Sequence, residues 1–452
     1  MQNVIAIFDV GKTNKKLVLF NEVYQIVHEE NVQLRETTDE DDFACEDVHA
    51  LTKWIKTSFD TISKDPRFNI KAINFSGYGA SFVYVDERNE IVAPLYNYLK
   101  PYPQNLQQKF YKKYGGETAV AKQTASPVLG SLNAGMQLYR LKNERPELLS
   151  TIKYALHLPQ YLSFILTHKP ATDITSIGCH TNLWNFAQHS YHNWVQAEKL
   201  EQYFAPILPA DAVTSFKHNN KEYFAGAGLH DSSAALIPYL HSFDEPFILL
   251  STGTWCISLN PFNHSMLTDY ELHQDCLCFF SYKEERIKAS RLFAGYEHEL
   301  QTKRLAEYFN KPADYYTTIK YDASCLKKVN VKIVSQAVAN EHAMVHQSIF
   351  KGRDLTMFKT YEQAYHQLMF DIMIQQVHSL KLVLQDNIKK IFVDGGFSKN
   401  DVYMSLLAGS FPAIEVYAAE VSHASALGAA LVMHKCWNEN PVPANLIGLK
   451  KY

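Results

Sequence analysis

A short pattern occurs twice in this chain: an apolar run, a turn with glycine and threonine, and a second apolar run. The first copy is the segment 4–20, whose turn holds Gly11, and the second is the segment 246–262, whose turn holds Gly253. Apolar, partly β-branched runs around a short polar turn predict a β-hairpin. Because one copy opens each half of the chain, the pattern predicts two domains of similar topology. The alternative is coincidence, since strand–Gly–Thr–strand segments are common.

The first turn reads Gly11-Lys12-Thr13, which resembles the end of a P-loop but lacks its spacing. A P-loop has the pattern GxxxxGK[ST] and opens a helix. The position five residues before Gly11 is Ala6, and a second strand-like run follows the turn. A hairpin of this kind can still bind phosphate through backbone N–H groups, a hydroxyl and an ammonium. The alternative is an ordinary edge hairpin whose polar tip faces water.

At 452 residues the chain exceeds the size at which one hydrophobic core stops growing, so two domains are expected. The polar segment 241–246 ends in proline and is the predicted boundary, which gives domains 1–242 and 243–452. A formal net charge of -3 gives no sign of a nucleic-acid or anionic membrane partner. We expect no signal peptide, no membrane span, and reduced thiols at the seven scattered cysteines, all of which favour a cytoplasmic location.

The first half alternates predicted strands and helices, which favours an α/β fold. Apolar residues at helical spacing occupy the segments 45–63, 103–114, 131–143 and 158–167. The segment 173–186 contains small and hydroxyl residues without clear periodicity, and we predict a structured loop there. The segment 424–433 predicts a helix of small residues that packs closely against a sheet.

A strand, a glycine pair and a helix follow one another in the segment 388–411. Gly395 and Gly396 would let a ligand approach the backbone, and Ser398 or Asn400 would cap the helix. The N-terminus of a helix favours anions. The GxGxxG spacing is absent, so a Rossmann dinucleotide site is not supported. The alternative is that the glycines serve packing alone.

Two aspartates are candidates for chemistry. Asp231 precedes a predicted helix and could take a proton from a hydroxyl that attacks phosphorus. The alternative role for Asp231 is a helix N-cap. Asp9 ends the first strand and could hold magnesium, which commonly uses one or two carboxylates plus substrate phosphates. The alternative role for Asp9 is to stabilise its turn.

In their order these segments resemble the FGGY family of carbohydrate kinases. The resemblance covers essentially the whole chain and rests on an Asp-x-Gly-x-Thr hairpin, a strand followed by Gly-x-Gly, a Gly-x-x-Asp helix start, a Thr-Gly-Thr hairpin and an Asp-Gly-Gly-x-Ser-x-Asn turn. It implies an α/β fold of two ribonuclease-H-like domains of the actin or hexokinase type, with an inter-domain cleft. It also implies transfer of the γ-phosphoryl group of ATP, with Mg²⁺, to a sugar or polyol hydroxyl.

Carried over residue by residue, the resemblance implies roles for particular side chains. Asp231 would be the catalytic base, and the metal would be held by Asp9 and Asp231. The phosphates and the nucleotide would be bound by Gly11, Thr13, Lys16, Thr252, Gly253, Thr254, Gly395, Gly396 and Asn400, the last near the adenine. The sugar would be bound by Tyr78, Gly79, Ser81, Tyr98, His230 and Asp231.

The resemblance is nearest to the rhamnulose kinase branch, whose His-Asp pair is matched by His230 and Asp231. Lys12 and Lys15 depart from that branch, and Ser81 stands where an acid is usual. The segment after the sugar strand also lacks the residue pairs of xylulose and glycerol kinases. A ketose or deoxyketose of the rhamnulose, fuculose or xylulose type is the expected substrate, and the sugar itself stays open.

Two alternatives remain on the same fold. One is another actin-type ATPase, against which the long insertion 77–224 and the Gly-x-x-Asp helix start speak. The other is a catalytically inactive sugar- or nucleotide-binding regulator, against which the intact Asp9 and Asp231 speak. A homodimer is common in such families, and the sequence does not decide the oligomeric state.

Overall fold

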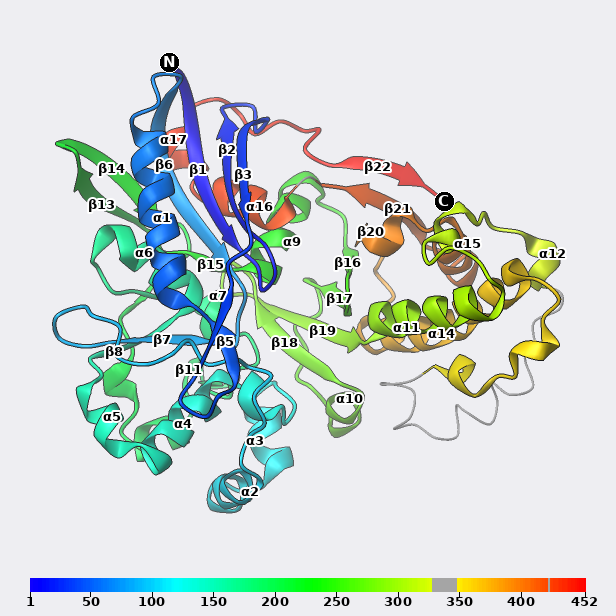
Figure 1. The fold of residues 1–452 in the computed structure, drawn as a ribbon, viewed down its shortest axis with the longest axis horizontal. Coiled ribbons are helices and arrows are strands. Elements are labelled where there is room, and N and C mark those ends of the chain that lie inside the picture. Colours follow the sequence, from blue (N-terminus) through cyan, green and yellow to red (C-terminus); the bar gives the residue numbers. More distant parts are fainter. Residues whose placement is uncertain (327–347, 422) are drawn as a thin grey trace. The chain divides into compact units, whose positions relative to one another are not determined.

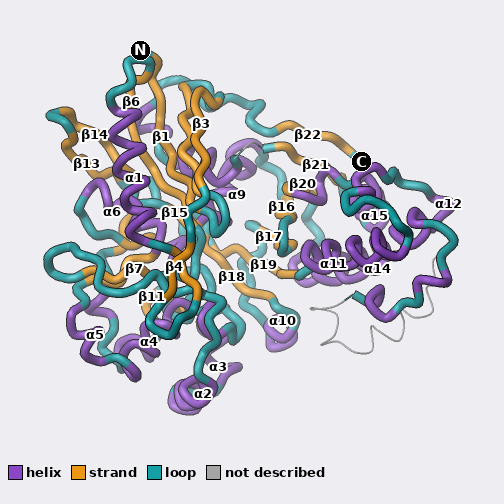
Figure 2. The backbone as a smooth tube through the Cα atoms, in the orientation of Figure 1, coloured by secondary structure: helices purple, strands orange, loops and turns teal. Residues whose placement is uncertain are grey.

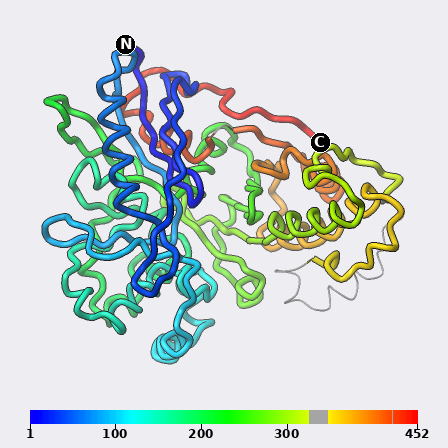
Figure 3. Tube along the Cα trace, viewed as in Figure 1, coloured from blue at the N-terminus to red at the C-terminus, as the bar shows by residue number. Residues whose placement is uncertain are grey.

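The computed structural model describes residues 1–326, 348–421 and 423–452, and the chain divides into two compact units. Unit 1 comprises Met1–Ser242, Cys278–Arg286 and Ser422–Leu446, and unit 2 comprises Phe243–Leu277, Ile287–Val421 and Ile447–Tyr452. The domains predicted from the sequence, 1–242 and 243–452, are continuous, whereas unit 1 also includes two segments of the later half. The second of these, Ser422–Leu446, brings a segment from near the end of the chain into the same unit as the N-terminal residues, as the red and blue traces show (Figure 3).

Unit 1 is built on a sheet with the strand order β13-β14-β6-β1-β2-β3, and the short strand β15 also pairs with β6 (Figure 1). Its strands are β1 (Gln2–Val10), β2 (Lys15–Asn21), β3 (Ile26–Val32), β6 (Phe68–Gly77), β13 (Val213–His218), β14 (Lys221–Gly226) and β15 (Leu229–His230). β1 pairs antiparallel with β2 and parallel with β6. The predicted hairpin at 4–20 is confirmed.

Helices cover both faces of this sheet. α1 (Val48–Ser63) and α6 (Leu158–Thr167) share a hydrophobic core with one face (Figure 2). On the other face, Asn74 of β6 donates from Nδ2 to the Ala429 carbonyl of α16 (Ala424–Val432), 2.8 Å away. Because alternate residues of a strand point to opposite faces, burial on both sides gives β1 a nearly continuous apolar run.

α16 packs against a helix as well as against the sheet. Its small residues bring it against α9 (Asp231–Ser242), and a Cβ added at Gly428 would lie 1.8 Å from the Ala234 carbonyl oxygen. No side chain fits at that distance, so glycine is required there. The sequence predicted the helix and its close packing but named only the sheet as its partner.

The sheet of unit 2 has the order β18-β19-β17-β16-β20-β21-β22. Its strands are β16 (Phe247–Thr252), β17 (Cys256–Asn260), β18 (Cys276–Phe280), β19 (Arg286–Leu292), β20 (Lys390–Gly395), β21 (Glu415–Glu420) and β22 (Gly448–Lys451). Parts of β18 and β19 fall in the segment that is counted with unit 1. The second predicted hairpin is confirmed as β16 and β17.

The two sheets repeat one arrangement. In each, the first strand lies between its antiparallel hairpin partner and a later parallel strand: β2-β1-β6 in unit 1 and β17-β16-β20 in unit 2. The register also matches, because the last residue of the first strand faces a glycine that ends the parallel strand. Val10 pairs with Gly77, and Thr252 pairs with Gly395. The weak repeat in the sequence thus corresponds to a repeat of topology.

Long helices form the core of unit 2 with this sheet. α11 (Ala294–Tyr308), α14 (Tyr361–Val383) and α15 (Asp401–Ser410) contribute apolar residues to one cluster with β16 and β20. The turn between β20 and α15 is a short 3₁₀ helix, η7 (Gly396–Lys399). No helix in the described part of the chain is both long and apolar enough to span a bilayer.

Smaller elements complete the units. Two-stranded sheets are formed by β4 (Glu36–Thr38) with β5 (Ala44–Glu46), β7 (Phe82–Val85) with β8 (Tyr154–His157), β9 (Thr172–Asp173) with β12 (Ile207–Leu208), and β10 (Trp184–Asn185) with β11 (Ser190–Tyr191). Among the described residues, the remaining α-helices are α2 (Gln104–Lys113), α3 (Glu117–Thr124), α4 (Ala134–Glu144), α5 (Pro146–Thr151), α7 (Ile174–Ile177), α8 (Asn193–Ala197), α10 (Asp269–His273), α12 (Ala323–Leu326) and α17 (His434–Trp437). The four helical segments named from periodicity are confirmed as α1, α2, α4 and α6.

Gly428→Ala tests the close packing of α16 on α9. The added methyl group would overlap the Ala234 carbonyl, so the free energy of unfolding should fall by about 1–3 kcal/mol. Urea unfolding measures the change. Gly409→Ala in α15 is the matched control, because a Cβ there meets no atom within 4 Å and alanine favours a helix. Equal unfolding midpoints for the two variants would contradict the packing.

Candidate active site

Strand register brings two aspartates to the same end of the unit 1 sheet. Asp9 of β1 pairs with Ser76 of β6, and Ser76 pairs with Leu229 of β15. These three residues therefore form one row across the sheet. Asp231 lies two residues beyond Leu229, at the first position of α9. The topology thus places the start of α9 beside the turn of the first hairpin.

The two carboxylates share a desolvated environment. Desolvation by the surrounding protein raises the pKa of Asp9, and the nearby charge of Asp231 raises it further, whereas a hydrogen bond from Ser425 lowers it. Ser425 Oγ of α16 donates to Asp9 Oδ2 over 2.8 Å. The Asp231 side chain is 34 % exposed, and desolvation raises its pKa to about 6. Its Oδ1 accepts from the backbone N–H of Ser232, the adjacent residue, over 2.6 Å.

His230 lies next to Asp231 and is almost fully buried. Its Nε2 is 3.3 Å from Asp231 Oδ1 and 3.0 Å from Cys179 Sγ. Burial lowers the pKa of His230 to about 3, so the imidazole is neutral and its contact with Asp231 is not an ion pair. Nδ1 is buried without a hydrogen-bond partner among the described residues. A Cβ at Gly79 would lie 2.9 Å from the imidazole ring, so glycine is needed there.

A buried ion pair underlies the predicted sugar-binding tyrosines. Lys15 Nζ is 2.7 Å from Glu46 Oε1, with both side chains 4 % exposed, and Tyr78 donates its hydroxyl to Glu46 Oε2 over 2.6 Å. The Tyr78 and Tyr98 rings meet edge to face at 6.0 Å. Burial raises the pKa of Tyr98, and the charge of Asp231 raises it further. Tyr98 therefore lies near the aspartate, whereas the Tyr78 hydroxyl is already engaged.

The other predicted residues of unit 1 have different surroundings. Gly11 N–H donates to the Asn14 carbonyl over 3.0 Å and closes the turn, which leaves Thr13 exposed at its tip. Lys16 Nζ lies 3.0 Å from His423 Nδ1, at the start of α16, and 3.8 Å from Glu29. No contact within the described residues joins Thr13 to the two aspartates.

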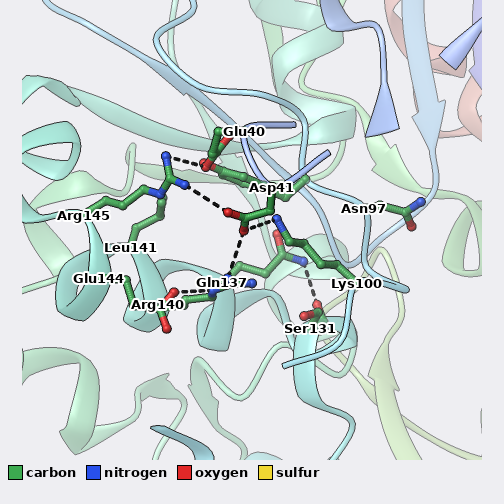
Figure 4. Close-up of a pocket in the computed structure, with 11 residues that line it drawn as sticks. Glu40, Asp41, Asn97, Lys100, Ser131, Gln137, Arg140, Leu141, Glu144 and Arg145 are labelled. Carbon is green, nitrogen blue, oxygen red and sulfur yellow. Dashed lines mark hydrogen bonds and ion pairs between the residues drawn. The ribbon is translucent and has the colours of Figure 1, made fainter. Parts of the chain in front are cut away.

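Ser81 is fully buried, and its Oγ donates to the Tyr96 carbonyl over 3.5 Å. The adjacent Ala80 has a left-handed backbone with φ 63°, and Gln137 Nε2 donates to its carbonyl over 2.7 Å. Gln137 also lines a pocket of about 30 Å³, whose charged side chains pair with one another, as Lys100 does with Asp41 at 2.7 Å (Figure 4). A volume of this size suits water. The pocket therefore supports the 79–81 turn and adds no large ligand site.

Unit 2 contains a pocket of about 800 Å³, which lies within the ~300–1,000 Å³ of small-molecule sites. Four of the predicted nucleotide-binding residues line it: Gly253, Thr254, Gly396 and Asn400. A Cβ added at Gly253 or Gly396 would meet no atom closer than 3.9 Å. The backbone at these two glycines is therefore open to a ligand. Three lysines and three acids line the same pocket, and one pair among them, Lys303 with Glu299, is joined at 2.6 Å.

Thr252 and Gly395 do not line this pocket but lie directly before two residues that do, Gly253 and Gly396, in the chain. Thr252 Oγ1 donates to the Asp394 carbonyl and accepts from Phe397 N–H over 3.0 Å. Gly395 has φ 78°, and a Cβ there would lie 1.8 Å from the Thr252 carbonyl oxygen. Both residues shape the β20–η7 turn and present no polar group that is shown to be open to phosphate.

Asn400 is confirmed as the N-cap of α15. Its Oδ1 accepts from Tyr403 N–H over 3.0 Å, and its Nδ2 donates to the Tyr365 hydroxyl over 2.6 Å. The helix start is therefore rigid where it meets the pocket. Ser398 was the other candidate for this cap. Its Oγ donates to the Gly395 carbonyl instead, and it does not cap the helix.

Three contributors to these sites were not predicted from the sequence. Gly295 is the second residue of α11, and a Cβ added there would lie 1.8 Å from the Gly253 carbonyl oxygen. A glycine in the first turn of a helix that follows a strand, in the sequence Phe-Ala-Gly-Tyr, is a signal that could have found it. Glu46 and Cys179 gave no such signal, because their partners Lys15 and His230 lie far from them in sequence.

Family models match both halves of the chain. The FGGY family of carbohydrate kinases, N-terminal domain, matches residues 4–231, and the carbohydrate kinase FGGY, C-terminal domain, matches residues 244–441. A rhamnulokinase of Mannheimia succiniciproducens is 24% identical over 271 residues, which are 56% of this chain and 52% of that protein. A rhamnulokinase of Klebsiella pneumoniae is 24% identical over 234 residues, which are 49% of this chain and 46% of that protein. The chain thus matches about half the length of these curated relatives.

Solved structures share the fold over the whole chain. A carbohydrate kinase from Novosphingobium aromaticivorans is 20% identical, with a TM-score of 0.77 over 100% of this chain and 94% of its own. A xylulose kinase from Rhodospirillum rubrum is 13% identical, with a TM-score of 0.81 over 99% and 94%. A gluconate kinase from Lactobacillus acidophilus is 15% identical, with a TM-score of 0.79 over 100% and 94%. The predicted two-domain fold of the actin or hexokinase type is therefore confirmed.

Lys15→Met tests the buried ion pair beneath the tyrosines. The variant leaves the Glu46 carboxylate buried beside Tyr78 without its cation, so the free energy of unfolding should fall by about 3–5 kcal/mol. Urea unfolding measures the loss. The control is Lys64→Met, which removes an exposed ion pair with Asp60 and should leave the midpoint unchanged. The interpretation is wrong if both lysines prove equally dispensable.

Proposed function

The chain belongs to the FGGY family of carbohydrate kinases, and from this we propose that it transfers the γ-phosphoryl group of ATP to a sugar hydroxyl. The observation that carries the proposal is that Asp9 and Asp231 both lie at one end of the unit 1 sheet, where the charge of Asp231 raises the pKa of Asp9. A glycine-lined pocket of nucleotide size in unit 2 supports it. Phosphoryl transfer depends mainly on positioning and on neutralising charge, and these two sites supply groups for both.

Asp231 is the proposed general base. With a pKa of about 6 it is ionised at neutral pH, yet it holds a proton more readily than an exposed aspartate. It takes the proton of the sugar hydroxyl while the hydroxyl oxygen forms a bond to the γ-phosphorus. The bond between that phosphorus and the bridging oxygen breaks, and ADP leaves with the electron pair.

The donor set at Asp9 and Asp231 fits a magnesium ion. Both carboxyl groups have a raised pKa, and the charge of Asp231 contributes to the shift at Asp9. Mg²⁺ commonly binds through one or two carboxylates plus phosphate oxygens. When bound, the ion would neutralise negative charge on the phosphates. Ser425 would orient Asp9 for this role by donating to Oδ2.

Unit 2 is the proposed nucleotide-binding unit. Gly253 and Gly396 let phosphates approach the backbone, and Lys320 and Lys399 would offset part of the phosphate charge, whereas Lys303 is paired with Glu299. Thr254 and Asn400 line the same pocket. Thr252 and Gly395, which were expected to bind phosphate directly, act in this proposal by fixing the β20–η7 turn. Gly11, Thr13 and Lys16 remain the proposed phosphate contacts of the first hairpin.

The proposed acceptor is a ketose or deoxyketose. Curated relatives with the name rhamnulokinase support that class. His230 Nδ1 and the Tyr98 hydroxyl are polar groups beside Asp231 that suit sugar hydroxyls. The Tyr78 hydroxyl is engaged by Glu46, so its ring is the part that would face a sugar. Gly79 contributes by making room for the imidazole, and Ser81 by anchoring its turn.

A coupled ADP-release assay against ketoses, deoxyketoses, aldoses and polyols tests the proposal, with Asp231→Asn as the decisive variant. Without the base, kcat on the best sugar should fall by about 10²–10⁴-fold, while nucleotide binding persists. Because a raised carboxyl pKa costs stability at neutral pH, the variant should melt higher than the wild type. Asp211→Asn, at an exposed position, is the control. ATP or sugar binding without transfer in the wild type would favour a regulator.

The pH dependence of kcat/KM gives an independent test of the base. Because Asp231 must be ionised to accept a proton, kcat/KM should fall about tenfold for each pH unit below about 6 and level off above about 7. Initial rates between about pH 5 and 9 at low sugar concentration measure it. The ordinary aspartate pKa is 3.8, so a profile that stays level down to that range would contradict the assignment.

A further inference from the structure

The segment 173–179 packs against the junction where β15 meets α9, and the proposed function gives it no role. We call it the cradle segment. It contains α7, and its residues from Asp173 to Cys179 are all buried. Two of its side chains contact His230, the residue before the proposed base. The cradle segment is therefore the part of unit 1 that holds the base from behind.

Thr175 contacts the backbone of this junction. Its Oγ1 accepts from the His230 N–H over 3.0 Å and donates its own proton to Asp173 Oδ1. A hydroxyl is the small side-chain group that can accept and donate at once. Asp173 is fully buried, and its Oδ1 also accepts from the Thr175 N–H over 2.9 Å. The hydroxyl is thus fixed on one side and grips the His230 backbone on the other.

The imidazole of His230 is held on three sides. Cys179 Sγ meets Nε2 at 3.0 Å, and Phe279 stacks on the ring at 5.7 Å with an interplanar angle of 16°. Gly79 closes the third side, because its backbone leaves no room for a Cβ. Since Nε2 also lies 3.3 Å from Asp231 Oδ1, a fixed ring fixes one neighbour of the carboxylate.

The cradle segment cannot shift easily. A Cβ at Gly178 would lie 2.2 Å from the Phe280 ring, so this ring packs directly on the backbone of the segment. Phe280 in turn stacks on Phe186 at 4.5 Å, and its carbonyl accepts from Ser233 Oγ of α9 over 2.9 Å. The same aromatic residue thus ties the cradle segment to the helix that Asp231 begins.

We propose that Thr175 is a positioning residue, which holds the β15–α9 junction so that the Asp231 carboxylate stays in place for proton transfer. The inference rests on the proposed function. Thr175 touches neither sugar nor nucleotide in this role and acts through the His230 backbone. Loss of its hydroxyl removes one fixed point of the junction and leaves the His230 N–H buried without its acceptor.

Thr175→Val keeps the shape of the side chain and removes both hydrogen bonds. A displacement of the base by a fraction of an ångström should lower kcat by about 10–100-fold, with KM for ATP changed less than about twofold. Thr175→Ser restores the hydroxyl and should recover kcat to within about threefold of the wild type. Steady-state kinetics on the best sugar measures all three enzymes.

Thr167→Val is the matched control. Thr167 is buried in the same unit, donates to the Ser163 carbonyl over 2.9 Å and accepts from the Lys169 N–H over 3.3 Å, but it does not touch the junction. It should lose stability as Thr175→Val does and keep its kcat. Equal kcat values for the two valine variants overturn the inference. If Thr175→Val fails to fold, Cys179→Ala takes its place, with an expected loss of about 3–10-fold in kcat.

A second measurement separates this inference from the proposed function. If the wild type transfers no phosphoryl group, the proposed function fails, but the coupling between Thr175 and Asp231 can still be measured. The change in Tm caused by Asp231→Asn should differ by about 2 °C or more between the wild-type and T175V backgrounds. Additive Tm changes would overturn the positioning role whether or not the protein is a kinase.

Discussion

The parallel register of β1, β6 and β15 is the constraint on which the rest of unit 1 depends. It places Asp9, Ser76 and Leu229 in one row, so that the residue two positions later, Asp231, begins a helix beside the first hairpin. β6 lies between β1 and β15 and pairs with both, so it sets the position of Asp9 relative to the start of α9. Close packing of α16 on α9 then adds Ser425 to Asp9 from the far end of the chain. The carboxylate pair is thus a product of sheet topology and of the return of the C-terminal segment.

Asp9 and Asp231 carry like charges in a desolvated environment, which destabilises the folded state. Hydrogen bonds to the two carboxylates reduce this cost. Asp9 accepts a hydrogen bond from the Ser425 hydroxyl, and Asp231 accepts from the backbone N–H and the hydroxyl of Ser232. Full satisfaction of both groups by the protein would leave no oxygen for a metal or a substrate proton. Desolvation by burial outweighs these hydrogen bonds and raises the pKa of both carboxyl groups. The same desolvation thus lowers the stability of the fold at neutral pH and raises the pKa of the two carboxyl groups to which we assign reactivity.

Local patterns in the sequence were enough for the two hairpins, the four helices α1, α2, α4 and α6, and the cap at Asn400, because each depends on residues a few positions apart. They were not enough for the partners of predicted site residues. Tyr78 was expected to contact sugar, and the structure adds that its hydroxyl donates to Glu46, which also pairs with Lys15. Thr252 was expected to bind phosphate, yet its hydroxyl closes a turn with Phe397. Such contacts join segments that are distant along the chain, and local patterns in a single sequence carry no signal for them.

The repeated topology also shows why a shared arrangement need not mean a shared task. The position of Asp9 in the first sheet corresponds, by register, to Ser251 in the second, and Val10 corresponds to Thr252. Only the first hairpin therefore places a carboxylate before its turn. The second sheet still carries an acid in this row, because Ser251 pairs with Asp394 of β20 where Asp9 pairs with Ser76 of β6. The repeat thus keeps one carboxylate in the row but moves it from the hairpin strand to the parallel strand. Since a carboxylate repels phosphate unless a cation lies between them, the strand that carries the acid decides which side of the row needs a cation.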